Sequence, residues 1–480
     1  MNAFKNYIDG RWVDASDGAT FENYNPARTG EILGTFPKAT REDTRRAIAA
    51  ARAALSGWAN TPGPTRGAIL DRASQIIDAR AQEFAVALTR EEGKTLAEAK
   101  GEVLRARDIF RYFSGEGWRI SGATLPGMTT NELLYTRREP LGVVSIITPW
   151  NFPIAIPAWK IAPALIYGNT VIFKPASDAP HAGMLLVEAL VEAGLPPGVI
   201  NFVTGSGSVV GDELASSPDI NGLSFTGSYN IGNGIYGQAI KNLTRVQLEM
   251  GGKNAMVVLN DAKLDLAVDL AVKGGFGLTG QACTATSRII VEQGIANAFV
   301  QALTEAARSL KVGDGLEDGV QMGPAINQDQ FENDLQYVTV GREESAQLVV
   351  GGGAVRDDGY YVQPTVFDHV EPKMRIAQEE IFGPVISVIR ARDFDDALQK
   401  ANDIGYGLSA GVVTSDLQKA FAFANNIDAG VVKINQPTTG LALNAPFGGF
   451  KHSSANTFKE QGQAAIEFYT RTKTIYVGHG

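Results

Sequence analysis

The chain of 480 residues contains a single cysteine, Cys283, within the segment GLTGQACTATSR. A cysteine that only fills a core is normally surrounded by apolar side chains, whereas this one is flanked by glycine, threonine, serine and glutamine. Such a loop favours exposure of the sulfur, and an exposed thiolate is a strong nucleophile. The sequence therefore predicts nucleophilic chemistry at Cys283, with a buried structural cysteine as the alternative.

Two further residues could assist a nucleophile. Glu249 lies between an apolar run and two glycines in LEMGGKN, where partial burial would raise the pKa of its carboxyl toward general-base duty. Asn151 lies between two prolines in ITPWNFP, and a fixed amide there could donate to a developing oxyanion. For a Glu or an Asn taken alone, an exposed carboxylate or a turn cap is the commoner role.

Three glycine- or lysine-containing segments could bind a nucleotide. FKPAS places Lys174 at the end of an apolar strand, where ligands of open α/β sheets bind, although a solvated lysine is common there. SFTGSYNIG would place Gly227 and Ser228 at the start of a helix, which suits a phosphate, with capping by Ser228 as the alternative. VTGSGSVVG, with Gly207 and Gly211, departs from the dinucleotide-binding spacing, so a plain turn is equally compatible.

These residues need a scaffold of alternating strands and helices. From about residue 142, short β-branched runs alternate with helical ones, which indicates a parallel α/β domain, and a second such alternation follows from about residue 254. Helices are predicted over 40–58, with Thr40 as N-cap, and over 71–93, ending at Gly93. Segments 132–140 and 466–477 alternate polar with apolar residues and could pair as a small projecting sheet.

Composition excludes several classes of protein. Lys and Arg number 43 against 52 Asp and Glu, so no basic surface for nucleic acid is expected. The most apolar region, 141–173, is interrupted by prolines and Lys160, which argues against a membrane span. One cysteine forms no intrachain disulfide and no secretory signal is visible, so a cytoplasmic location is expected. Four scattered histidines predict no metal.

Seven segments carry a resemblance to a known family. ITPWNFP, GNTVIFKPAS, SFTGS, LEMGGKN, FGLTGQACTATSR, EEIFGPV and NAPFGGFK occur in the order and spacing of the aldehyde dehydrogenase superfamily, which the chain resembles over its whole length. The resemblance implies an α/β fold with two parallel-sheet domains and a β-flap for oligomerisation, as homodimer or homotetramer. The dinucleotide-binding domain would span 1–118 and 141–250, the catalytic domain 251–435, and the flap 119–140 and 460–480.

The resemblance also implies roles for the candidate residues. Cys283 would attack an aldehyde, Asn151 would hold the oxyanion, and Glu249 would activate the water that releases a carboxylic acid. Lys160 and Glu460 resemble a proton-relay pair. Cofactor binding is implied for a larger set: Ile147, Thr148, Trp150, Lys174, Ser177, Gly207, Gly211, Phe225, Thr226, Gly227, Ser228, Ile231, Gly251, Glu380 and Phe382.

The choice of cofactor and substrate depends on single positions. NAD-preferring members often carry Glu three residues after the Lys, where this chain has Ser177, so use of both NADP and NAD is predicted with a preference for NADP; Asp178 is a counter-indication. Several segments are most similar to those of bacterial 2,5-dioxovalerate (α-ketoglutarate semialdehyde) dehydrogenases, and Trp159 stands where succinate-semialdehyde members carry Arg. Substrate contacts are predicted at Phe152, Trp159, Arg107, Arg111 and Phe447.

Four alternatives remain open. The substrate could be another aldehyde, such as succinate semialdehyde or an aliphatic or aromatic aldehyde. The acyl group could pass to CoA instead of water, although the base Glu249 argues against this. A cysteine hydrolase or acyltransferase without a redox step would need a histidine near the cysteine, and only His452 lies close to a motif. A non-catalytic binding protein is disfavoured by the combination of Cys283, Glu249 and Asn151.

Overall fold

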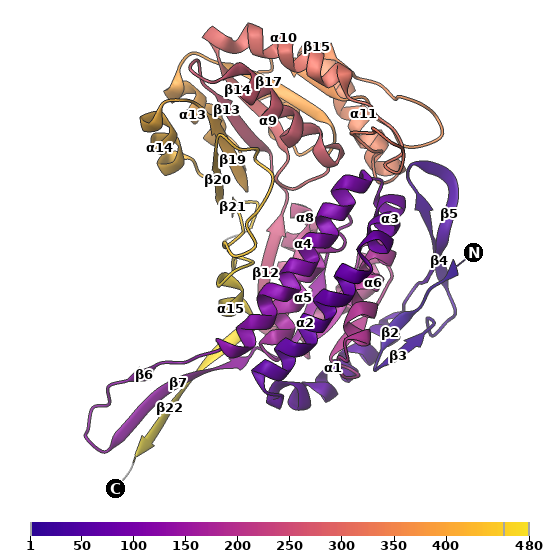
Figure 1. The fold of residues 1–480 in the computed structure, drawn as a ribbon, viewed down its shortest axis with the longest axis vertical. Helices are drawn as coiled ribbons and strands as arrows, with labels where there is room; N and C mark the ends of the chain where they lie inside the picture. Colours follow the sequence, from indigo (N-terminus) through magenta and orange to yellow (C-terminus); the bar gives the residue numbers. More distant parts are fainter. Residues whose placement is uncertain (1, 455–456, 479–480) are drawn as a thin grey trace.

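The computed structural model describes residues 2–454 and 457–478 (Figure 1). Within this part of the chain, two seven-stranded sheets are each covered by helices, and a three-stranded sheet projects from one end of the molecule. The N-terminus lies on the opposite side from this projection, in a small sheet of β1 (Asn2–Ala3), β5 (Arg28–Pro37) and β4 (Thr20–Asn25). Two parallel-sheet α/β domains and a β-flap are the architecture expected from the sequence.

The first sheet has the strand order β12-β11-β8-β9-β10-β2-β3. Its first five strands pair in parallel, while β2 and β3 are antiparallel. Chain order reverses between β8 and β11, and open α/β sheets bind ligands at the carboxyl ends of strands beside such a switch point. The strands are β2 (Asn6–Ile8), β3 (Arg11–Val13), β8 (Val143–Ile147), β9 (Thr170–Lys174), β10 (Ile200–Phe202), β11 (Gly222–Gly227) and β12 (Arg245–Met250).

Helices cover both faces of this sheet. One apolar cluster includes Leu70, Phe110 and Phe173, and the other includes Ile48, Ile172 and Leu248. The helices are α1 (Arg41–Asn60), α2 (Gly63–Ala79), α3 (Ala81–Glu92), α4 (Leu96–Ser114), α5 (Ala155–Ile166), α6 (Pro180–Glu192), α7 (Asp212–Ser216) and α8 (Tyr229–Ala239).

The predicted helix ends are partly correct. Thr40 caps α1 with a capping box, and α3 ends at Gly93, whose φ of 92° suits glycine. The prediction of one continuous helix over 71–93 is wrong, because the backbone of Arg80 leaves the helical region (ψ 13°) and separates α2 from α3.

The second sheet has the order β15-β16-β17-β14-β13-β19-β20, parallel except at β15. Apolar clusters on its two faces include Val257 and Phe367 on one side and Met256 and Phe299 on the other. The strands are β13 (Asn254–Val258), β14 (Thr286–Glu292), β15 (Gln347–Val350), β16 (Thr365–Asp368), β17 (Val385–Ala391), β19 (Ser409–Val413) and β20 (Val431–Ile434); the helices are α9 (Leu264–Phe276), α10 (Gln293–Ser309), α11 (Gln328–Glu343), α12 (Arg375–Gln378), α13 (Phe394–Asn402) and α14 (Leu417–Asn426).

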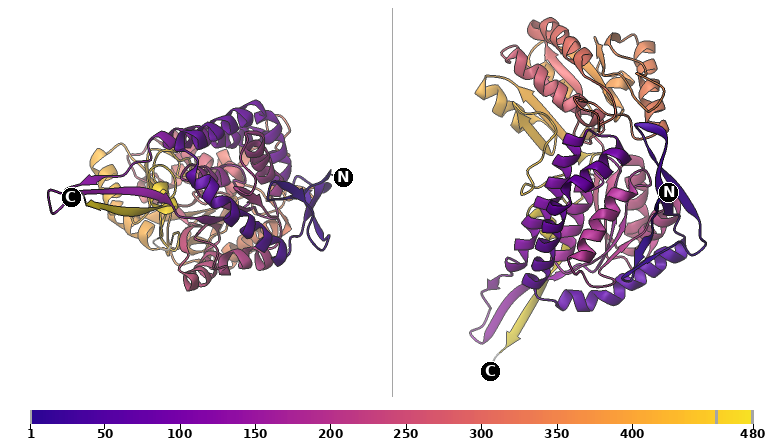
Figure 2. Two further views of the ribbon diagram at one scale, coloured as in Figure 1. Left: turned by 90° about the horizontal axis from the view of Figure 1, so that it is seen from below. Right: turned by 45° about the vertical axis from the view of Figure 1, so that its right-hand side comes forward.

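The projecting sheet joins segments that are far apart in the chain. β7 (Glu132–Pro140) pairs antiparallel with β22 (Thr470–Gly478), and β6 (Thr124–Leu125) adds a short edge. Figure 2 shows this flap standing clear of the main body. The strand predicted from residue 466 begins only at Thr470, because α15 (Ala464–Tyr469) buries Phe468 and Tyr469 in the core of the first sheet.

No helix within the described residues is both long enough and apolar enough to cross a membrane. No group of three or more His, Cys, Asp or Glu side chains there is arranged to hold a metal ion.

Candidate active site

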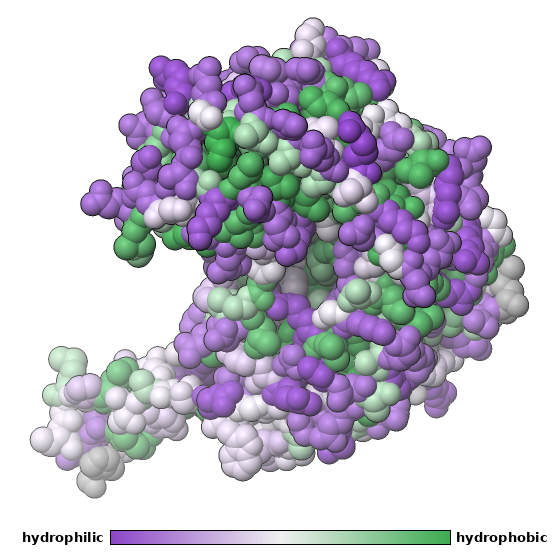
Figure 3. All heavy atoms as spheres, turned by 45° about the horizontal axis from the view of Figure 1, so that its top comes forward, coloured by the Kyte–Doolittle hydropathy of each residue, from purple (hydrophilic) through white to green (hydrophobic). Residues whose placement is uncertain are grey.

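Cys283 lies between the two sheets and lines two cavities. One cavity, of about 320 Å³, opens at the carboxyl ends of β8 and β11 beside the switch point of the first sheet. The other, of about 370 Å³, lies against α4 and α5. Figure 3 shows the surface hollowed between the two halves of the molecule. The first cavity is called the nucleotide-side cavity and the second the α4-side cavity.

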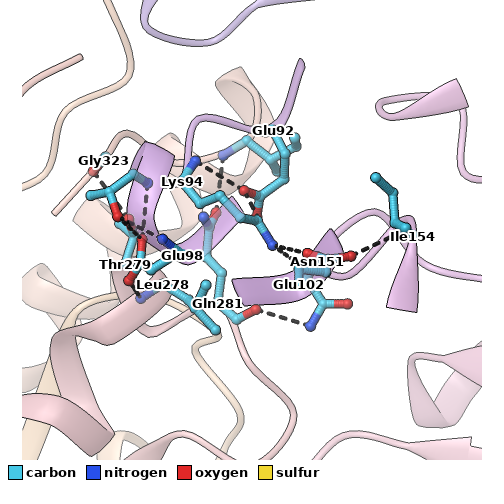
Figure 4. A network of polar contacts seen from close by, with 12 residues as sticks. Glu92, Lys94, Glu98, Glu102, Asn151, Ile154, Leu278, Thr279, Gln281 and Gly323 are labelled. Carbon is cyan, nitrogen blue, oxygen red and sulfur yellow. Dashed lines mark hydrogen bonds and ion pairs between the residues drawn. The ribbon is translucent and has the colours of Figure 1, made fainter. Parts of the chain in front are cut away.

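The loop that presents Cys283 has a strained backbone. Leu278 and Thr279, five and four residues before the cysteine, both adopt left-handed conformations with φ of 54° and 58°. Such conformations cost about 1–3 kcal/mol each and persist when surrounding contacts enforce them. Here Glu98 of α4 accepts a hydrogen bond from the Leu278 N–H at 2.7 Å, and the Thr279 hydroxyl donates to the Gly323 carbonyl at 3.1 Å (Figure 4). The cysteine is thereby held against α4.

The surroundings of the Cys283 thiol favour its protonated form. Burial, followed by the nearby charges of Glu249, Glu380 and Glu460, raises its pKa to about 12. Three carboxylates therefore lie close enough to act on the sulfur electrostatically. A proton acceptor must accordingly take the thiol proton before attack.

Asn151 is held beside this loop by a buried network. Its side-chain N–H₂ donates to the Gln281 carbonyl at 2.9 Å, and its backbone carbonyl accepts from the Lys94 ammonium at 2.7 Å (Figure 4). Lys94 also pairs with Glu102 at 2.6 Å. Glu102 in turn accepts from the N–H groups of Ile154 and Ala155 at the start of α5. The network fixes Asn151 relative to α4, α5 and the cysteine loop.

Within the described residues, the Asn151 amide keeps one N–H free beside Cys283. It lines the nucleotide-side cavity together with Cys283, and its second amide N–H has no acceptor among the described residues. The backbone N–H of Cys283 likewise makes no hydrogen bond to a described residue. Two donors beside one sulfur are the arrangement that stabilises a tetrahedral intermediate.

We expect Asn151→Ala to lower kcat by about 100- to 1000-fold, the usual cost of removing one oxyanion donor. Steady-state kinetics with an aldehyde measure this effect, and cofactor affinity measured by fluorescence should change little. Asn426→Ala, an exposed amide on α14, is the matched control and should retain full activity. An unchanged kcat in Asn151→Ala would remove this residue from the oxyanion site.

Glu249 lies at the end of β12, where burial and Glu460 raise the pKa of its carboxyl well above the usual value. Neither carboxyl oxygen has a hydrogen-bond partner within the described chain. The carboxyl packs against Gly448, where a Cβ would lie only 2.5 Å from Oε1. Glu249 forms part of neither cavity wall, so it must rotate to reach a substrate at Cys283.

Lys160 and Glu460 form a buried ion pair close to Glu249. Lys160 also donates to the Ser224 hydroxyl at 2.8 Å, and the Trp159 indole donates to Glu460 at 2.7 Å. Both members of the pair are at most 2% exposed. The pairing that the resemblance implied is therefore present in space.

Seven of the predicted cofactor residues line the nucleotide-side cavity: Trp150, Thr226, Gly227, Ser228, Gly251, Glu380 and Phe382. Glu380 accepts from the Gly252 N–H at 2.8 Å, and the rings of Trp150 and Phe382 contact edge to face with centroids 5.4 Å apart. The wall also contains Pro149, Met250, Gln330, Asn333 and Ile381, which the sequence did not single out. Gln330 and Asn333 lie on α11, whose sequence carries no recognisable motif.

The other predicted cofactor residues lie outside this wall. Ile147, Thr148 and Phe225 are buried at the ends of β8 and β11, and Lys174 is buried at the end of β9. Ser177 donates to the Gly205 carbonyl at 3.3 Å. Gly207 and Gly211 are the first and last residues of a short helical turn, and Ile231 is exposed on α8.

The nucleotide-side cavity fits a polar, phosphate-bearing cofactor. Ser228 makes no side-chain cap on α8, so the alternative of ordinary capping is not observed and the N–H groups of the first turn remain for a ligand. The buried hydroxyls of Thr148 and Thr226 have no partner among the described residues. Buried hydroxyls are normally hydrogen-bonded, so a bound ligand would satisfy these.

The α4-side cavity contains two of the five predicted substrate residues, Phe152 and Trp159. Phe447 is buried behind Trp159, with ring centroids 6.1 Å apart. The other residues that line the α4-side cavity are Glu98, Gly101, Glu102, Arg105, Ala155, Leu278, Ala282, Cys283, Thr284, Thr439, Gly440 and Leu441.

Arg107 and Arg111 are not brought to the cavity, which corrects the placement predicted for them. Arg107 pairs with Asp78 and Asp108, and Arg111 is exposed. The cavity-facing positions 98, 101, 102 and 105 follow the i, i+3, i+4, i+7 spacing of one helix face. Residues 107 and 111 fall on another face of α4. The positively charged side chain that α4 contributes to the wall of this cavity is that of Arg105.

A nucleophilic cysteine that opens onto a nucleotide-type cleft on one side and a second cavity on the other is the arrangement of a cysteine-dependent dehydrogenase. The model of the aldehyde dehydrogenase family matches residues 12–475, and the chain belongs to this family. It is 46% identical to the 2,5-dioxopentanoate dehydrogenase of Saccharolobus solfataricus over 100% of both chains. It is 48% identical to the α-ketoglutarate semialdehyde dehydrogenase of Haloferax volcanii over 98% of both.

Solved structures agree with the fold. The crystal structure of an NADP-dependent enzyme of Escherichia coli matches with a TM-score of 0.96 at 37% identity, covering 99% of this chain and 98% of the other. Betaine aldehyde dehydrogenase of Staphylococcus aureus in complex with NAD+ matches with a TM-score of 0.96 at 36% identity, covering 98% and 94%.

Proposed function

We propose that this protein oxidises a carboxylate-bearing semialdehyde, 2,5-dioxopentanoate, to the dicarboxylic acid with NADP or NAD. The observation that carries the proposal is the position of Cys283, which lines both the nucleotide-side and the α4-side cavity. A carbonyl carbon bonded to the sulfur would then lie between a cofactor and the rest of the substrate. The substrate class is supported by the relatives from Saccharolobus and Haloferax.

In the first half-reaction, the Cys283 thiol gives up its proton to solvent water, and the sulfur attacks the aldehyde carbon to form a thiohemiacetal. The oxyanion accepts hydrogen bonds from the Asn151 amide and the Cys283 N–H. When bound, NAD(P) supplies the hydride acceptor for this carbon. Glu380, Phe382 and Trp150 in the wall of the nucleotide-side cavity would hold it there.

In the second half-reaction, the thioester on Cys283 is hydrolysed. Glu249 accepts a proton from water, the resulting hydroxide adds to the thioester carbon, and the sulfur leaves and is reprotonated. The raised pKa of Glu249 makes this carboxylate a stronger base than an exposed one. Lys160 and Glu460, an ion pair buried close to Glu249, would carry the proton onward.

The preference for NADP stays part of the proposal. Ser177 carries no charge that would repel a 2′-phosphate, and the Asp178 carboxylate already accepts from the Asn327 amide at 2.8 Å. The buried Lys174, whose ammonium has only the Pro175 carbonyl as acceptor among the described residues, is available to a ribose or a phosphate.

A panel of aldehydes tests the proposed function. We expect kcat/KM for 2,5-dioxopentanoate to exceed that for pentanal, its chain-length match without a carboxylate, by about 100-fold, the effect of one charge-assisted contact. The same panel run with NADP and with NAD should give higher kcat/KM with NADP. Equal values for the two aldehydes would contradict the substrate assignment, whatever the cofactor result.

Assembly and location belong to the same proposal. The flap exposes Leu133, Tyr476 and Val477 on a sheet with open edges, which a second subunit would cover in a homodimer or homotetramer. A cytoplasmic location stays a prediction.

A further inference from the structure

The α4-side cavity has one cationic side chain in its wall. Arg105 comes from the same face of α4 as Glu98 and Glu102, and it is the only Lys or Arg among the described residues that line this cavity. An arginine keeps its charge at all physiological pH values. A guanidinium in the wall of the cavity that contains Cys283 is a suitable partner for an anionic ligand.

Arg105 is held in place by neutral groups. Its Nη1 donates to the Leu441 carbonyl at 2.5 Å, and its Nη2 donates to Oε1 of Gln461 at 2.9 Å. No ion pair with a carboxylate forms at Arg105 within the described residues, whereas Arg107, two positions later, has two. A guanidinium has five N–H donors, so donors remain for a ligand.

The carboxylates in the same wall are already bound elsewhere. Glu102 pairs with Lys94 and accepts from the start of α5. Glu98 accepts from Thr95 and from the Leu278 N–H. Neither of them forms an ion pair with Arg105, so within the described residues its guanidinium has no carboxylate partner.

The surroundings of Arg105 strengthen an interaction with an anion. Its guanidinium carbon lies 5.9 Å from the centre of the Trp159 ring, and burial lowers the pKa of Arg105. Partial removal from water makes a charge-assisted hydrogen bond stronger than one at the surface. The two neutral acceptors fix the plane of the guanidinium, which suits a planar carboxylate.

We propose that Arg105 binds the carboxylate of the substrate while Cys283 attacks the aldehyde at its other end. This inference rests on the proposed function and assigns its specificity to a single side chain. The two groups line one cavity, so a short chain carrying both functional groups can contact both at once.

The test compares three variants on two substrates. Arg105→Met removes the charge but keeps a long side chain, Arg105→Lys keeps the charge, and Arg107→Met removes a charge outside the cavity. For Arg105→Met we expect kcat/KM for 2,5-dioxopentanoate to fall by about 100-fold, chiefly through KM, with little change for pentanal. Arg105→Lys should recover part of this loss, and Arg107→Met should behave like the wild type.

The outcomes separate this inference from the proposed function. If the wild type itself shows no preference for the carboxylated aldehyde, the proposed function fails and the inference fails with it. If the wild type shows the preference and Arg105→Met retains it, only the role of Arg105 is overturned. Equal losses on both substrates would also overturn it, because Arg105 would then only support the Leu441 and Gln461 segments.

Discussion

Replacing Cys283 with alanine is expected to lower aldehyde oxidation by about 10⁴-fold or more, because the chain contains no second thiol that could form the covalent intermediate. Neither half-reaction proceeds without a bond between sulfur and the carbonyl carbon. NAD(P)H absorbance during turnover measures the loss directly.

Cofactor affinity provides the control for this variant. Cys283 contributes one small side chain to the nucleotide-side cavity, so binding of NADP to Cys283→Ala, followed by fluorescence, should stay near the wild-type value. Oxidation at more than a few per cent of the wild-type rate in Cys283→Ala would mean that another group performs the attack.

Glu249→Gln is expected to separate the two half-reactions. Steady-state turnover should fall by about 100- to 10,000-fold, the usual contribution of a positioned general base. One equivalent of NAD(P)H per active site should still form in a rapid burst, since Asn151 and Cys283 are unchanged. Stopped-flow absorbance distinguishes the burst from the slow phase.

The pH dependence follows from the raised pKa of Glu249. Only the deprotonated carboxylate accepts a proton from water, so the wild-type hydrolysis rate should rise as pH increases through that raised pKa. Glu249→Gln should lose this rise. Glu343→Gln, an exposed carboxylate on α11, is the matched control. A Glu249→Gln enzyme with normal turnover, or without a burst, would contradict the assigned role.

Each residue proposed for catalysis follows a strong local signal in the sequence. Asn151 lies in a proline-containing turn just beyond a buried strand, Glu249 lies at the end of a buried strand before two glycines, and Cys283 is the single cysteine in a polar loop. The strands themselves were predictable because parallel strands buried on both faces are continuous apolar runs. The family resemblance rests on seven sequence motifs that occur in a fixed order along the chain.

The wall formed by α4 could not be predicted in the same way. Helix periodicity identifies an apolar face but does not decide which polar residues border a cavity. The sequence therefore pointed to Arg107 and Arg111, whereas Arg105 lines the cavity. Lys94 and Glu102 gave no signal either, because their burial depends on contacts with Asn151 and α5, about 50 residues away in sequence. Such long-range polar networks appear only when the elements are packed.

The central claim is that oxidation proceeds through an acyl group on Cys283. Mass spectrometry of Glu249→Gln, quenched with acid after the burst with NADP and 2,5-dioxopentanoate, tests it most directly. We predict one acyl adduct per chain, on the peptide that contains Cys283. A full burst of NADPH from an enzyme whose Cys283 peptide remains unmodified would contradict the account.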